Sequence, residues 1–227
     1  FKGYADFRSE MNARTARQID RAQPDLTPGE KYLRTLEHLG SGSLISDVSQ
    51  YTLNNLQKSY AQLDQGTVEQ IVDILLRSDR KYIAGFRGTA CCAQYMASKL
   101  LFLTPHVVPI LHADATAVEN LLDITERDCL FLYSFPRYSE IARPLMEIAR
   151  ESGAKVILMT DRRTSPLANK ADVVVTAQVD GLGFTNSYVA PLSLSEVILL
   201  SVSGRKDVKD SKRFNRIDSV MEREKLY

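Results

Sequence analysis

The feature that most constrains the fold of this chain is an alternation of short, β-rich apolar runs with longer stretches of helical patterning. The β-rich runs fall at residues 81–85, 106–111, 128–134, 154–160 and 172–177. Helical patterning covers 90–103, 137–152 and 188–202. Strands that alternate with helices are joined by right-handed crossovers and form a parallel sheet with helices on both faces. The sequence therefore predicts an α/β fold with an open, doubly wound parallel sheet.

Two of the runs favour a parallel sheet because they are apolar on both faces. Residues 129–133 (CLFLY) and 156–159 (VILM) contain no charged side chain. Strands that are covered by helices on both sides need this composition, whereas half-exposed strands alternate between polar and apolar residues.

The part of the chain that precedes the first strand is predicted to be helical. Apolar residues recur near helical spacing between residues 43 and 60, and a clearer helix follows from Gly66. Thr67 and Gln70 have the spacing of a capping box, which predicts that this second helix begins there.

The chain divides into three predicted segments: residues 1–42, 43–203 and 204–227. The first is charged and interrupted by proline and glycine, and it carries Arg8, Arg14, Arg17 and Arg21. Those arginines indicate either a DNA-proximal arm or a solvated helix that leads into a linker. The second segment holds the helices and the sheet. The third is rich in both charges, which is typical of an exposed helix or tail.

Composition narrows the function classes. The 227 residues include 29 basic and 28 acidic side chains, so the net charge is too small to attract the chain electrostatically to nucleic acid or to a membrane. No apolar stretch approaches the ~20 residues that span a bilayer, and the opening residues are not a secretory signal. Cys91, Cys92 and Cys129 lack zinc spacing and are expected to be buried free thiols. We therefore expect a cytoplasmic protein with no membrane contact, no metal and no cofactor.

The loop that follows the first predicted strand has the composition of an anion site. Ligands of open parallel sheets bind beyond the carboxyl ends of the strands, where helices begin. In this loop Gly88 allows close approach of the backbone, Thr89 offers a hydroxyl, and Arg87 offers a planar cation. The loop is neither a dinucleotide fingerprint nor a Walker loop. The alternative is a tight turn with a capping threonine.

Two further loops carry ligand-binding side chains. Ser134, Arg137, Tyr138 and Ser139 follow the most apolar strand, where they can bind a phosphate or carboxylate, or simply cap the next helix. Before the last predicted helix, Asn186 and Ser187 can bind ligand hydroxyls or cap that helix.

The order of these elements resembles a SIS (sugar isomerase) domain. The resemblance lies in the strand-loop-helix at 85–101, the loop at 134–139 and the stretch at 160–172. The opening residues, FKGYADFR, resemble the end of the helix-turn-helix domain of RpiR-type transcriptional regulators. The resemblance implies a five-stranded flavodoxin-like sheet, a homodimer or homotetramer, and a phosphosugar held by the strand-end loops. It also implies that residues 1–42 are the end of the helix-turn-helix domain and a linker.

This sequence departs from the family's pattern inside the expected pocket. Thr89 stands where the family usually has a loop serine, and Ser134 and Ser139 occupy the outer hydroxyl positions of its Ser-x-Ser-Gly-x-Thr loop. Pro136 replaces the middle serine, Arg137 the glycine, and Arg87 a commonly small residue. These changes imply an anionic ligand other than an ordinary hexose phosphate.

A sensor is expected rather than an enzyme. SIS domains also occur in sugar-phosphate isomerases, which need a Glu or His base beside the substrate. His38, His106, His112 and Glu196 do not form a convincing acid–base set. The sequence therefore predicts the effector-binding domain of a bacterial transcriptional regulator that senses a sugar phosphate or sugar acid. DNA would be bound through an N-terminal helix-turn-helix domain largely absent from this chain. The alternatives are a SIS-type isomerase and a metabolite-binding accessory protein that regulates an enzyme.

Overall fold

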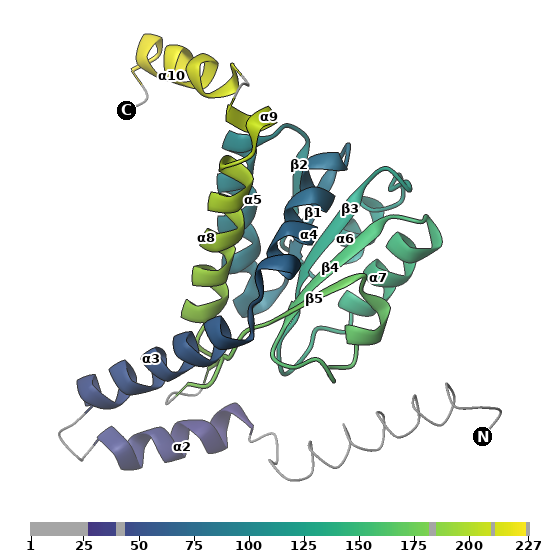
Figure 1. Ribbon diagram of the computed structural model, residues 1–227. Coiled ribbons are helices and arrows are strands. Elements are labelled where there is room, and N and C mark those ends of the chain that lie inside the picture. The colour runs from purple at the N-terminus through teal and green to yellow at the C-terminus, as the bar shows by residue number, and fades with distance from the viewer. Residues whose placement is uncertain (1–26, 40–43, 182–184, 210–211, 226–227) are drawn as a thin grey trace.

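A five-stranded parallel sheet forms the centre of the molecule (Figure 1). The computed structural model describes residues 27–39, 44–181, 185–209 and 212–225. The strand order is β2-β1-β3-β4-β5, and every predicted strand is present to within one or two residues at each end, which confirms the fold class. The strands are β1 (Lys81–Gly85), β2 (Val107–Ile110), β3 (Cys129–Tyr133), β4 (Lys155–Thr160) and β5 (Val173–Thr176).

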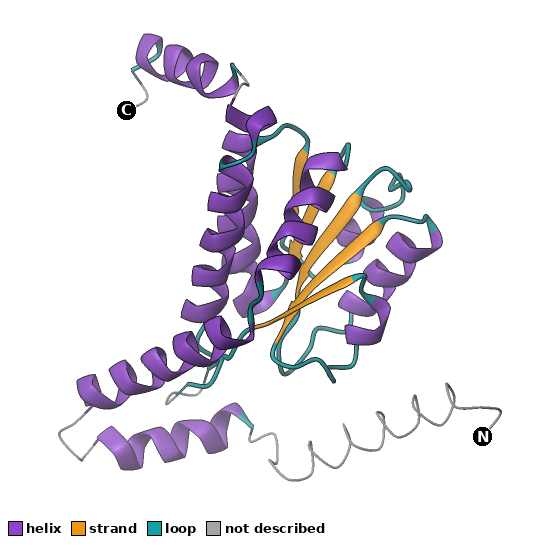
Figure 2. Cartoon of the chain, viewed as in Figure 1, coloured by secondary structure: helices purple, strands orange, loops and turns teal. Residues whose placement is uncertain are grey.

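Helices cover both faces of the sheet (Figure 2). The helices α4 (Gln65–Arg77), α5 (Ala90–Leu103) and α8 (Val189–Ser203) pack on one face, and α6 (Ala115–Glu119) and α7 (Ala142–Glu151) on the other. Each face has its own buried apolar cluster, in which alternate residues of β1, β3 and β4 point to opposite sides. A sheet that is buried on both faces explains why these strands are apolar throughout.

The order in which strands are added to the sheet reverses between β1 and β3. From β1 it passes through α5 to β2 at one edge, whereas from β3 it passes through α7 to β4 and β5 towards the other edge. The two strands are neighbours, with Gly85 paired to Tyr133 at their carboxyl ends. Their loops diverge to opposite faces, and this opens a crevice where ligands of such sheets bind.

An N-terminal helical extension precedes the sheet, as predicted, and a charged C-terminal segment follows it. The extension contains α2 (Pro28–Leu39) and α3 (Leu44–Gln62), and the C-terminal segment contains α9 (Lys206–Lys209) and α10 (Arg213–Arg223). The carboxyl half of α3 is fastened to the chain after β5, where Asn55 Nδ2 donates to Asp180 O (2.6 Å) and Gln178 N donates to Ser59 Oγ (2.8 Å). Residues 1–8 and the arginines interpreted as either a DNA-proximal arm or a solvated helix, Arg8, Arg14, Arg17 and Arg21, lie outside the described residues.

One predicted helix cap and one predicted helix start are wrong. The N-cap of α4 is Asp64, whose carboxylate accepts from the Thr67 N–H (2.8 Å) and the Thr67 hydroxyl (2.7 Å), so Thr67 does not begin a capping box. The helix expected from residue 137 begins at Ala142 instead. Arg137 has φ of 67°, a left-handed conformation that a right-handed helix cannot contain.

The cysteines also differ from expectation at one position. Cys92 and Cys129 are buried, but Cys91 is exposed. Burial raises the pKa of Cys129 to about 11, so this thiol stays protonated at neutral pH. Within the described ranges, no group of three or more His, Cys, Asp or Glu side chains could hold a metal ion, and no helix is long and apolar enough to cross a membrane.

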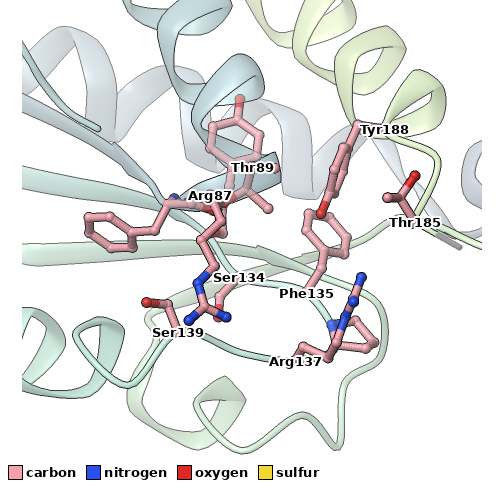
Figure 3. A pocket seen from close by; sticks show the side chains of 12 residues that line it. Arg87, Thr89, Ser134, Phe135, Arg137, Ser139, Thr185 and Tyr188 are labelled. Carbon is pink, nitrogen blue, oxygen red and sulfur yellow. Dashed lines mark hydrogen bonds between the residues drawn. The ribbon is translucent and has the colours of Figure 1, made fainter. Parts of the chain in front are cut away.

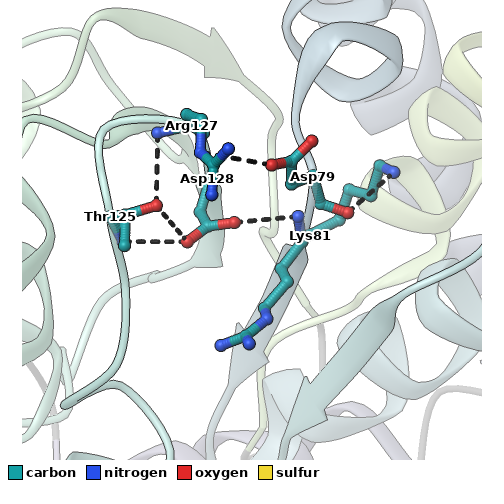
Figure 4. Close-up of polar contacts among 6 residues, drawn as sticks. Asp79, Lys81, Thr125, Arg127 and Asp128 are labelled. Carbon is teal, nitrogen blue, oxygen red and sulfur yellow. Dashed lines mark hydrogen bonds and ion pairs between the residues drawn. The ribbon is translucent and has the colours of Figure 1, made fainter.

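Polar contacts fasten the amino ends of β1 and β3, at the edge of the sheet opposite the crevice (Figure 4). The buried Asp128 carboxylate accepts from the Thr125 N–H (2.8 Å), the Thr125 hydroxyl (2.9 Å) and the Arg80 N–H (2.9 Å). Lys81 is also buried and donates to Thr104 Oγ1 (3.1 Å) and Pro105 O (3.2 Å), while burial lowers its pKa. Each buried charge has hydrogen-bond partners, which indicates a structural role for both.

Candidate functional site

A pocket of about 230 Å³ lies at the carboxyl ends of β1 and β3 (Figure 3). Its walls come from the loop after β1, the loop after β3 and the segment before α8, which are distant in sequence. This is the crevice created where the order of strands reverses. The lining residues are Phe86, Arg87, Gly88, Thr89, Tyr133, Ser134, Phe135, Pro136, Arg137, Ser139, Thr185 and Tyr188.

Thr89 holds the loop after β1 in its shape. Its hydroxyl oxygen accepts from the Phe86 N–H (2.8 Å) and donates to the Phe86 carbonyl (2.8 Å). The same oxygen lies 3.3 Å from the Tyr133 carbonyl at the end of β3. The hydroxyl is therefore used inside the protein and joins the two walls of the pocket.

Tyr188 forms a wall of the pocket from the start of α8. Its ring lies against the loop after β1, since a Cβ added to Gly88 would come within 2.7 Å of Tyr188 Cε2. It also makes an edge contact with Phe135, with ring centroids 6.0 Å apart. Burial raises the pKa of Tyr188, so the phenol remains a neutral hydrogen-bonding group.

Ser134 has the most unusual environment in the pocket. It is 4% exposed, and its N–H donates to Met159 O (3.0 Å), continuing the β3–β4 pairing. Its hydroxyl is buried and has no hydrogen-bond partner in the described part of the chain. A buried hydroxyl without a partner is costly, so it is suited to a ligand that supplies the missing hydrogen bond.

Two arginines make the pocket positive. Arg87 and Arg137 both line it, and neither forms an ion pair or a side-chain hydrogen bond within the described residues. The lining described above contains no Asp, Glu or His. An anion in this pocket would meet two guanidinium groups with no competing carboxylate.

The structure brings most of the predicted site residues together. Arg87, Gly88, Thr89, Ser134, Arg137 and Ser139 line the one pocket. Tyr138 does not, and its hydroxyl donates to Asp161 Oδ1 (2.8 Å). The other predicted residues outside the lining are Asn186, whose Nδ2 lies 3.4 Å from Pro136 O, and Ser187, whose N–H donates to Val179 O (3.0 Å).

Sequence reasoning missed the apolar and aromatic walls of the pocket. Phe86 directly follows β1 and Phe135 lies two residues after β3, so their positions at the binding edge were the available signal. The segment before α8 was predicted to contribute, but through Asn186 and Ser187, whereas the residues that line the pocket are their neighbours Thr185 and Tyr188. Only packing against the loop after β1 brings Tyr188 into the pocket.

The candidate bases lie elsewhere. His106 precedes β2, at the opposite end of the sheet, and His112 is exposed after that strand. Glu196 accepts a hydrogen bond from the Tyr95 hydroxyl (2.9 Å), between α5 and α8. His38 has a side chain outside the described part of the molecule.

Comparison with known proteins identifies a family model and a curated protein that are similar to this chain. The SIS domain family model matches residues 74–201. An uncharacterized HTH-type transcriptional regulator of Haemophilus influenzae is 21% identical over 233 residues, which cover 98% of this chain and 77% of that protein.

Two solved structures are similar in fold. The sugar isomerase domain of the RpiR transcription factor of Sphaerobacter thermophilus has a TM-score of 0.73 at 22% identity, covering 80% of this chain and 99% of that chain. The Vibrio vulnificus NanR protein, complexed with ManNAc-6P, has a TM-score of 0.67 at 17% identity, covering 82% of this chain and 71% of that chain.

Proposed function

This chain belongs to the SIS domain family, and from that premise we propose that it is the effector-binding part of a transcriptional regulator. It would bind an anionic sugar derivative at the carboxyl ends of β1 and β3 and leave it chemically unchanged. The named relatives support this proposal, since one is an HTH-type regulator, another is an RpiR factor, and a third was solved with a sugar phosphate.

The observation that carries the proposal is the buried, unpartnered hydroxyl of Ser134 in a pocket with two unpaired arginines. A folded protein rarely leaves a buried hydroxyl unsatisfied. An oxyanion would accept its hydrogen bond and would neutralise part of the charge of Arg87 and Arg137.

The composition of the pocket favours binding over isomerisation. An isomerase needs a group that removes a proton from the carbon beside the carbonyl, and the best candidates are Glu and His. The lining that the structure describes offers neither, and the raised pKa of Tyr188 keeps its phenol protonated. Aldose–ketose isomerisation remains the alternative activity, with a base supplied by another subunit.

Regulation requires that the ligand favour one arrangement of subunits over another. We propose a homodimer or homotetramer in which ligand binding changes the spacing of two N-terminal DNA-binding domains. That spacing decides how well the two domains fit paired operator half-sites. An accessory protein that regulates an enzyme would use the same pocket but would lack DNA-binding domains.

A thermal-shift titration of the whole chain tests the proposal. The panel pairs sugar phosphates and sugar acids with their uncharged counterparts. We expect saturable stabilisation by anionic members alone, with an apparent affinity from linkage. The best ligand is then incubated with the protein and followed by NMR. Conversion to a new sugar phosphate would favour the isomerase, whereas the absence of any shift with anionic compounds would overturn the pocket assignment.

A further inference from the structure

We propose that the ligand of this pocket carries two anionic groups at opposite ends, as a phosphorylated sugar acid does. The phosphate would lie beside Arg87, Ser134 and Ser139, and the carboxylate beside Arg137 and Tyr188. This inference rests on the proposed function and narrows its ligand class.

The first argument is the number of cations. Arg87 comes from the loop after β1 and Arg137 from the loop after β3, and the register between these strands brings the loops to the same edge. Neither guanidinium has an ion-pair partner among the described residues, and the lining contains no carboxylate. A single phosphate carries enough charge to pair with both guanidiniums only if both can reach it, so the positions of the two side chains decide whether the pocket takes one anionic group or two.

The second argument is where the two side chains point. Figure 3 shows the Arg87 guanidinium directed towards Ser134 and Ser139, whereas Arg137 extends on the other side of Phe135 towards Tyr188. The Arg137 charge also acts on Tyr188, where it opposes the rise in pKa that burial causes. The pocket therefore has two positive regions with Phe135 between them, rather than one.

The third argument is the backbone. Arg87 has φ of 55° and Arg137 has φ of 67°, a left-handed conformation that glycine adopts without strain and a long side chain adopts rarely. Strain of this kind concentrates at ligand sites, where the side chain has a role that offsets it. Two such arginines in one pocket favour a role for both.

The hydrogen-bond donors in each region indicate which anionic group of the ligand binds there. A phosphate has three terminal oxygens and needs several donors, and the Arg87 region offers a guanidinium, the unpartnered Ser134 hydroxyl and the hydroxyl of Ser139. The Arg137 region offers one guanidinium with a neutral phenol. A planar carboxylate can bind this guanidinium through both oxygens.

Three open-chain compounds that differ only at the ends test this inference by calorimetry on the whole chain. These are a hexonate 6-phosphate, the matching hexitol 6-phosphate and the unphosphorylated hexonate, used for three hexose configurations. We expect the hexonate 6-phosphate of at least one configuration to bind about tenfold or more tightly than its hexitol 6-phosphate. Arg137→Gln should remove that preference, because it should weaken the hexonate 6-phosphate much more than the hexitol 6-phosphate.

Further variants separate the possible outcomes. Arg87→Gln should weaken both phosphates, and Arg216→Gln, an equal charge change on the exposed face of α10, should change neither. Equal affinity for the two phosphates, or an Arg137→Gln variant that weakens both equally, would overturn the two-anion ligand and leave the anion-binding function standing. Binding of the unphosphorylated hexonate alone would overturn the two-anion ligand in the same way. If no anionic compound of either panel binds, the proposed function fails with it.

Discussion

The hydroxyl of Tyr133 lies 2.7 Å from the hydroxyl of Ser195, and both residues are buried. Tyr133 ends β3, where the loop with Ser134 and Arg137 begins, and Ser195 lies in α8, whose first turn follows Tyr188. Burial raises the pKa of Tyr133 well above its ordinary range, so the phenol stays a hydrogen-bond donor. One buried hydrogen bond therefore links the elements that carry opposite walls of the pocket.

Removing either partner of this bond should have unequal effects. After Tyr133→Phe, Ser195 still donates to Pro191 O (2.8 Å), so we expect a loss of about 1 kcal/mol in the free energy of unfolding. Ser195→Ala leaves a buried phenol hydroxyl without a partner and should cost more, about 1–3 kcal/mol. Urea unfolding measures both, and the opposite ranking would contradict the assigned geometry.

Ser134→Ala should separate binding from stability. The substitution removes a buried hydroxyl that has no partner in the described structure, so we expect a free energy of unfolding that is unchanged or up to about 1 kcal/mol higher. Ligand affinity should fall about tenfold, because a charge-assisted hydrogen bond is lost. Unfolding and calorimetry on the same preparation check both. A destabilised variant with normal affinity would show that Ser134 has a structural role only.

Thr89→Ala should lower stability as well as affinity. It leaves the Phe86 N–H without its acceptor in a buried loop, at a cost of about 1–3 kcal/mol. Thr89→Ser keeps the hydroxyl and is the matched control, with near-normal unfolding and binding. If the alanine variant were as stable as the parent, the hydroxyl would not hold the loop as described.

Gly88→Ala should displace Tyr188. The new Cβ would lie 2.7 Å from Tyr188 Cε2 and 2.8 Å from its hydroxyl, so the end of the side chain must move. We expect weaker ligand binding with a small loss of stability, since the ring is at the end of a rotatable side chain. The double variant with Tyr188→Ala should show no additional loss beyond Tyr188→Ala alone. Additive losses in a binding cycle would mean that the two residues act independently.

Asp172 should contribute to the acid sensitivity of the fold. Partial burial raises its pKa, but hydrogen bonds from the Val156 N–H (2.8 Å) and Lys155 Nζ (3.0 Å) outweigh this, and the pKa of the carboxyl group is lowered from its ordinary value. A carboxyl group with a lowered pKa stabilises the fold above its unfolded pKa of about 3.9 and loses that contribution as the pH falls through the folded value.

Asp172→Asn should therefore be less stable than the parent at pH 7, and the difference should shrink below about pH 4. Chemical unfolding between pH 7 and pH 3 measures this trend. A difference in the free energy of unfolding that stays constant over the whole pH range would show that ionisation of Asp172 does not contribute to stability.

Much of the architecture could be predicted because it depends on local patterns. Apolar runs such as residues 129–133 can be buried on both faces only between two layers of helices, so the parallel sheet and its strands follow from composition. Arg87 lies two residues after β1 and Ser134 directly after β3, and these positions place both residues at one edge of the sheet. The cap of α4 at Asp64 was missed because several capping residues compete within a few positions, and contacts decide among them.

What the sequence by itself determined is therefore the layer architecture and the edge at which polar loops gather. Only the tertiary structure decided how those loops meet. The pairing of β1 with β3 brought Thr89 to the Tyr133 carbonyl, packing placed Tyr188 over Gly88, and the backbone turned left-handed at Arg87 and Arg137. These relationships join residues about 45 to 100 positions apart or depend on a strained conformation, and the energy that selects them comes from contacts that no local pattern encodes.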